Sequence, residues 1–123
     1  MTKICTSIEQ SKKLSSLGFD ISTADMFYNL GESKIPEVIY GSHDDFKCYI
    51  PCWSLAALLS VLPKKYYPVK DHETNLILGK PKDKWCVLYW DATGIQDGEE
   101  TIADNPVDAC YKMIIKLHEQ NLL

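Results

Sequence analysis

The stretch that decides the fold is Trp85-Cys86-Val87-Leu88-Tyr89-Trp90, which is apolar or aromatic at every position. A run of this kind is typical of a central β-strand that is covered on both of its faces. It follows a second strand-like run, Asn75-Leu76-Ile77-Leu78-Gly79, and residues 80–84 between the two have the composition of a turn. We therefore expect an antiparallel hairpin, with Trp90 in the hydrophobic core.

The C-terminal segment after this hairpin predicts a helix. Asp104 or Asn105 is placed to cap it, Pro106 suits the first helical position, and Asp108 puts a negative charge in the first turn. Residues 99–102 just before it are expected to add an edge strand. One face of the helix is apolar and should pack on the sheet, through Val107, Cys110, Tyr111, Ile114 and Leu117.

The N-terminal half of the sequence predicts a helix followed by two strands. Ser7-Ile8-Glu9-Gln10 matches a capping box, and Gly18 stands where a left-handed residue ends a helix, so a helix should run from about Ser7 to Leu17. Residues 24–28 and 46–50 are strand-like and should lie side by side. Residues 31–45 between them should form a long loop or a hairpin excursion, with a strand-like piece at 38–40.

A short apolar helix is expected to begin at Trp53 or Ser54 and to end at Leu62, because Pro63 cannot continue it. The predicted order of elements is then α-β-β-α-β-β-β-α. This order defines an α+β fold, with a small, mostly antiparallel sheet packed against helices. The length of 123 residues fits a single globular domain over residues 1–123.

Composition and charge exclude several classes of function. Hydrophobic residues make up 46% of the chain and charged residues 24%, which is typical of a soluble globular protein. The net charge of −4 lacks the basic bias of proteins that bind nucleic-acid phosphates. The first residues are polar where a secretory signal would be apolar, and no run reaches the length of a membrane helix. We expect a cytoplasmic protein that binds no membrane, and the charge makes nucleic acid a less favoured partner than protein.

Cys52 is the candidate for a catalytic nucleophile. Pro51-Cys52-Trp53-Ser54 resembles the Cys-Trp helix start of papain-like cysteine proteases, and the start of a helix favours a thiolate. His72 follows in the right chain order to act as the base, and Asn75 or Asp91 could orient it. The spacing from Cys52 to His72 is much shorter than in that family, and no glutamine is placed upstream of the cysteine at the position where the family has its oxyanion-hole residue. The same residues also fit the ordinary start of a buried helix. A hydrolase that uses Cys52 as nucleophile and His72 as base is therefore the alternative hypothesis.

The five cysteines carry no metal or disulfide signature. Their odd number fits reduced thiols in a cytosol, and Cys86 and Cys110 have the pattern of small core residues. His43, Cys48 and Cys52 could be combined into a zinc site only by borrowing a fourth ligand, and their spacing is irregular. We therefore expect no metal and no cofactor.

Aromatic residues make up 11% of the chain, and those in loops are candidates for a recognition patch. Tyr40 lies in the expected loop excursion. Lys64-Lys65-Tyr66-Tyr67 follows the helix-ending proline, where a solvated loop is expected, and it sets aromatic rings beside positive charge. The sequence thus favours a protein-binding surface that includes Tyr40, Lys64, Lys65, Tyr66 and Tyr67. For residues 64–67, binding of single-stranded nucleic acid is a weaker alternative.

Three blocks of sequence support a resemblance to a known family. The blocks are residues 5–11 with 23–26, residues 50–55 with Leu58-Leu59, and residues 103–117. Together they resemble a family of short uncharacterised proteins carried by gut Bacteroidales and by their phages or mobile elements. The resemblance spans most of the chain apart from residues 31–45, and it implies a genomic setting rather than an activity. It carries over no functional residues, so the prediction is a non-enzymatic protein-binding or accessory module.

Overall fold

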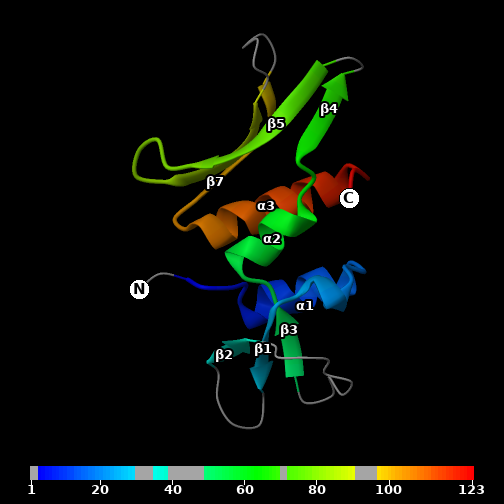
Figure 1. Cartoon of the computed structure of the whole chain (residues 1–123), viewed down its shortest axis with the longest axis vertical. Helices are drawn as coiled ribbons and strands as arrows, with labels where there is room; N and C mark the ends of the chain where they lie inside the picture. Colours follow the sequence, from blue (N-terminus) through cyan, green and yellow to red (C-terminus); the bar gives the residue numbers. More distant parts are fainter. Residues whose placement is uncertain (1–2, 30–34, 39–48, 70–71, 91–96) are drawn as a thin grey trace. The chain divides into compact units, whose positions relative to one another are not determined.

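The computed structural model describes residues 3–29, 35–38, 49–69, 72–90 and 97–123, with only the backbone of residues 65–69, 72–73 and 97–98. The fold is α+β, as predicted, and the sheets are antiparallel. The chain divides into two compact units, Met1–Ser60 and Val61–Leu123, and each has a sheet of its own (Figure 1). The prediction of one globular domain over residues 1–123 stays a prediction.

The first unit contains a sheet of three strands in the order β2-β1-β3. Met26 of β1 lies opposite Cys52 of β3, and Tyr28 lies opposite Ile50, which confirms the predicted pairing of these two segments. Helix α1 packs against β3 (Figure 1). The elements are α1 (Ile8–Ser16), a 3-10 turn η1 (Ile21–Thr23), β1 (Met26–Asn29), β2 (Pro36–Val38), β3 (Tyr49–Cys52) and α2 (Leu55–Val61).

The second unit contains a sheet of four strands in the order β4-β5-β6-β7, with α3 lying along one face of it (Figure 1). The predicted hairpin is confirmed, because Ile77 pairs with Leu88 and Gly79 with Cys86. Residues 99–102 lie in the edge strand that was expected. The elements are β4 (Lys65–Val69), β5 (His72–Gly79), β6 (Trp85–Trp90), β7 (Asp97–Ala103) and α3 (Pro106–Glu119).

The helix ends follow the predicted local chemistry. Ser7 accepts from the Gln10 backbone at 3.1 Å, and the Gln10 side chain accepts from the Ser7 backbone at 2.9 Å, which completes the capping box of α1. Gly18 has a φ of 91°, a conformation that favours glycine. Asn105 caps α3 by accepting from the Asp108 backbone at 2.8 Å. These local signals determine where both helices begin.

Three expectations differ from the structure. The segment around Cys52 is the end of β3, and the helix begins only at Leu55. Residues 65–69 form strand β4 rather than a solvated loop, although Pro68 within them lacks a backbone N–H, which confines such a strand to a sheet edge. The single predicted sheet is two sheets, because β1–β3 and β4–β7 share no strand pairing in the described residues.

Strand β6 is central, as predicted, but only one of its faces is fully covered. Val87 and Tyr89 point to the α3 side and are almost completely buried, at 0% and 1% exposure. Trp90 points to the other side and is 45% exposed, so the expectation that it lies in the core is wrong. Alternation along the strand separates these residues onto opposite faces, although all of them are apolar.

Candidate functional site

Cys52 lies at the end of β3 and has no exposed surface. It belongs to a small cluster of buried side chains in the first unit that also includes Cys5, Met26, Tyr28 and Ile50. Two residues separate it from the first residue of α2, so it is not placed in the first turn of a helix. The dipole argument for an activated Cys52 thiolate therefore does not apply to this structure.

Cys5 is brought to Cys52 by the segment that precedes α1. This segment forms an antiparallel bridge in which Cys5 lies opposite Ser54, and the Thr6 backbone donates to the Trp53 carbonyl at 2.9 Å. Side chains two positions apart on one strand share a face, so Cys52 lies on the same side as Cys5. The two thiols belong to one buried cluster and influence each other's ionisation, and Cys5 is only 2% exposed.

Tyr28 completes the surroundings of the cysteine pair. Its hydroxyl lies 3.5 Å from the Cys5 sulfur and donates to the Thr6 carbonyl at 2.8 Å. Lys3 is half-buried and lies two residues before Cys5, where its positive charge acts on the thiol. The pair is therefore surrounded by a phenol, a nearby cation and apolar side chains.

The two thiols are electrostatically unequal. The contact with Cys52 lowers the pKa of Cys5 below the ordinary value of 9.0, against the opposing effect of burial, and Tyr28 and Lys3 lower it further. The contact with Cys5 and burial raise the pKa of Cys52. Cys5 is therefore the thiol of the pair that ionises first as the pH rises, and Cys52 keeps its proton to higher pH.

Hydrogen bonds hold the backbone around Cys52 in place. The Trp53 backbone donates to the Thr6 hydroxyl at 3.0 Å, and its indole N–H donates to the Thr23 hydroxyl at 2.8 Å. Asp25 accepts from the Ser54 backbone at 2.9 Å and from the Ser54 hydroxyl. These bonds fix the N-terminal segment, β1 and the start of α2 against one another, so Cys5 and Cys52 face each other in a preorganised setting.

The catalytic prediction at Cys52 and His72 stays a prediction, because only the backbone of His72 is described. The raised pKa of Cys52 does not favour a nucleophile at this position. His43 and Cys48, which were considered with Cys52 as zinc ligands, lie outside the described residues. Among the residues that are described, no three His, Cys, Asp or Glu side chains gather into a group that could hold a metal ion.

The second feature is the face of the four-stranded sheet that points away from α3. We call it the open face. It carries exposed apolar side chains on three adjacent strands: Ile77 is 41% exposed, Trp90 45% and Ile102 50%. Large apolar side chains grouped on one surface are typical of interaction sites. The residues of the open face include Asn75, Ile77, Gly79, Cys86, Leu88, Trp90, Glu100 and Ile102.

One end of the open face is hollowed into a pocket of about 220 Å³. Its floor includes the Cys86 thiol, which donates to the Glu100 carboxylate at 3.5 Å. Lysines and Pro81 of the turn between β5 and β6 form the rim. The lining residues are Pro81, Lys82, Lys84, Cys86, Glu100 and Ile102.

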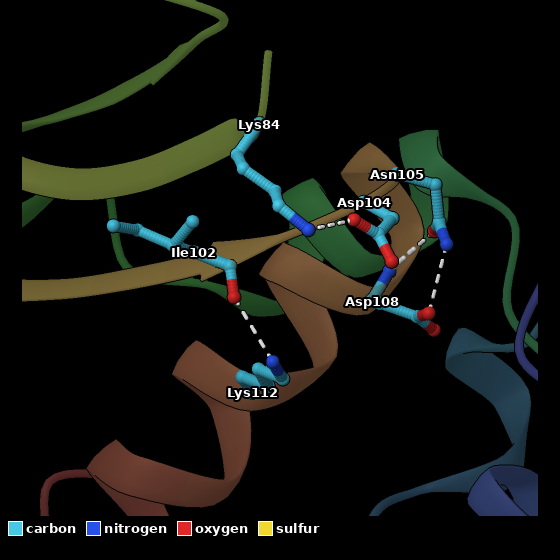
Figure 2. Close-up of polar contacts among 6 residues, drawn as sticks. All are labelled: Lys84, Ile102, Asp104, Asn105, Asp108 and Lys112. Carbon is cyan, nitrogen blue, oxygen red and sulfur yellow. Dashed lines mark hydrogen bonds and ion pairs between the residues drawn. The ribbon is translucent and has the colours of Figure 1, made fainter. Parts of the chain in front are cut away.

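The junction between β7 and α3 holds this end of the face in position. Figure 2 shows Lys84 paired with Asp104, and Lys112 of α3 donating to the Ile102 carbonyl at 2.9 Å. The Ile102 side chain lies on the side of β7 away from Lys112. The backbone of Ile102 is thus fixed to the helix, while its side chain stays exposed on the open face.

The predicted binding residues lie elsewhere in the chain. Lys64 is exposed and directly precedes β4. Lys65, Tyr66 and Tyr67 are part of strand β4, where only their backbone is described. Tyr40 lies outside the described residues. The role of these five residues in binding stays a prediction.

Sequence reasoning missed both features for physical reasons. No pattern links Cys5 to Cys52, because the bridge that joins them connects segments far apart in the chain. Cys86 and Cys110 were correctly predicted to be buried, at 5% and 0% exposure, and burial raises the pKa of Cys110 to about 12. The open face escaped notice because β6 is apolar on both sides.

Comparison of this chain with protein-family models, with curated proteins and with solved structures finds no match. None of the helices in the described part of the chain has the length and apolar character needed to cross a bilayer.

Proposed function

We propose that this chain is a non-enzymatic protein-binding module whose contact surface is the open face. The observation that carries the proposal is the exposure of Ile77, Trp90 and Ile102 on adjacent strands of one sheet. Aromatic and aliphatic side chains on a rigid sheet supply contact area at a low entropic cost. The predicted setting in a phage or mobile element of gut Bacteroidales forms part of this proposal.

The proposed partner is a protein segment with an apolar side chain and a neighbouring carboxylate. The pocket beside Ile102 has room for an aliphatic side chain, and Cys86 and the apolar stems of Lys82 and Lys84 offer it contacts. Lys82 is exposed at the rim, whereas Lys84 is paired with Asp104. A carboxylate on the partner would complement the charge of Lys82.

We expect Ile102→Glu to weaken binding of such segments about tenfold or more, which corresponds to ~1.4 kcal/mol. The probe is a set of peptides selected on the wild-type protein from a displayed random library, with affinities measured by fluorescence anisotropy. Selected peptides should combine apolar with acidic residues. Val38→Glu is the matched control, because Val38 is 49% exposed, against 50% for Ile102, and lies in the other sheet.

Two outcomes would contradict this proposal. One is a set of selected peptides that bind wild type and Ile102→Glu equally well. The other is a wild-type homodimer, seen by light scattering, that Ile102→Glu converts to a monomer, because the face would then be occupied by a second copy of the chain.

A further inference from the structure

The buried cysteine pair suggests an activity that a binding module does not require. Cys5 and Cys52 are two reduced thiols that pack in the same buried cluster. Hydrogen bonds on both sides of the pair fix the backbones that carry them, through Thr6 and Ser54. We propose that Cys5 and Cys52 are a redox-active pair that hydrogen peroxide converts into an intramolecular disulfide.

The different environments of the two sulfurs indicate that Cys5 reacts with peroxide first and Cys52 second. The Cys5 thiolate attacks one oxygen of hydrogen peroxide, the O–O bond breaks, and the Cys5 sulfenic acid forms as hydroxide leaves and takes up a proton to become water. The Cys52 sulfur then gives up its proton and attacks the Cys5 sulfur, and the sulfenic oxygen leaves as a second water. In total, two thiols and one peroxide become one disulfide and two waters.

The surroundings of the pair favour a small oxidant. Cys5 is 2% exposed, so an oxidant reaches its sulfur only when the segment before α1 opens. A short opening of this segment, which breaks its bridge to Ser54 and its hydrogen bonds with Trp53 and Tyr28, would admit a molecule as small as peroxide. Cys86 and Cys110 are also buried, and burial raises the pKa of both, so their thiolates are scarcer.

The disulfide would tie the segment before α1 covalently to the end of β3. The two side chains already pack in one buried cluster, and the hydrogen bonds of Thr6 with Trp53 can persist when the disulfide forms. Oxidation is therefore expected to leave the fold intact and to fasten the N-terminal segment in place.

The experiment is treatment of the reduced full chain with hydrogen peroxide, followed by intact-mass measurement and by non-reducing peptide mapping. We expect a loss of two hydrogens, a linked pair of peptides that contains Cys5 and Cys52, and full reversal by dithiothreitol. In Cys52→Ser, oxidation should stop at a Cys5 sulfenic acid that dimedone traps. Cys110→Ser is the matched control, because Cys110 is equally buried, and it should react like wild type.

The mapping on wild type decides the proposal even if a cysteine variant fails to fold. A linkage between Cys48 and Cys52 would overturn it, and so would oxidation that leaves all thiols free to alkylation after unfolding. Cys5→Ser lacks the proposed attacking thiol, so a disulfide between other cysteines that still forms at the wild-type rate would also contradict the proposal.

The pH dependence of the reaction follows from the lowered pKa of Cys5. Only the thiolate attacks peroxide, so the rate should rise with pH and level off below the ordinary cysteine pKa of 9.0. The same chain unfolded in urea should level off at higher pH, because the folded environment of Cys52, Tyr28 and Lys3, which together outweigh burial and the opposing Asp25 carboxylate, is lost. Stopped-flow or quenched-alkylation rates from pH 5 to 10 measure this difference, and identical profiles for folded and unfolded chain would contradict the assignment of Cys5.

Discussion

Replacing Trp53 with alanine is expected to lower the free energy of unfolding by about 3–5 kcal/mol. Trp53 is 1% exposed, and it lies between the strand that carries Cys52 and the start of α2. Alanine would leave a large cavity and would remove the indole donor to the Thr23 hydroxyl. Urea unfolding followed by circular dichroism measures the change.

The variant Trp53→Phe separates packing from hydrogen bonding at this site. Phenylalanine keeps most of the apolar volume but cannot donate to Thr23, so we expect a loss of about 1–2 kcal/mol. A cost near zero for Trp53→Ala would contradict the position of this side chain in the structure. Equal costs for both variants would show that the indole hydrogen bond, rather than the packing, stabilises the unit.

Ile114→Ala should have the second large effect, a loss of about 2–5 kcal/mol in the free energy of unfolding. Ile114 is 1% exposed and lies on α3, the helix that packs against β6 and β7. Its truncation removes apolar contacts that no neighbouring side chain can replace without moving the helix.

Trp90→Ala is the comparison for Ile114→Ala, because Trp90 belongs to the same unit and is a larger apolar residue. It is 45% exposed on the open face, so its truncation should cost about 1 kcal/mol or less. The larger residue is thus expected to matter less for stability. A loss at Trp90 as large as that at Ile114 would show that the open face is covered in solution.

Local signals in the sequence predict the helix ends well, because capping depends on residues a few positions apart. Ser7 with Gln10, and Asn105 with Pro106, act within one helical turn, and the structure confirms both. The hairpin of β5 and β6 is predictable for the same reason, since a short turn joins two strongly apolar strands. These contacts need no knowledge of the rest of the fold.

The features that could not be predicted depend on contacts between distant segments. Cys5 meets Cys52 only through the bridge to Ser54, and Asp25 reaches Ser54 from another strand. The predicted loop at Lys65 to Tyr67 is instead an edge strand that pairs with β5, and Pro68 lies where the register of this pairing shifts, a position that tolerates a missing N–H. The composition of β6 could not reveal which of its faces would be covered, because Val87 and Trp90 are both apolar.

The edges of the two sheets limit how this chain can associate with others. Among the strands that the structure describes, three of the four at a sheet edge contain a proline, and the fourth, β7, contains acidic residues: Pro36 in β2, Pro51 in β3, Pro68 in β4, and Glu99 and Glu100 in β7. A proline cannot donate a ladder hydrogen bond, and like charges repel an incoming copy of the same strand. The chain should therefore resist edge-to-edge aggregation when it is concentrated. For the same reason, a partner that extends a sheet by adding a strand finds poor pairing, and recognition through side chains on a sheet face is favoured.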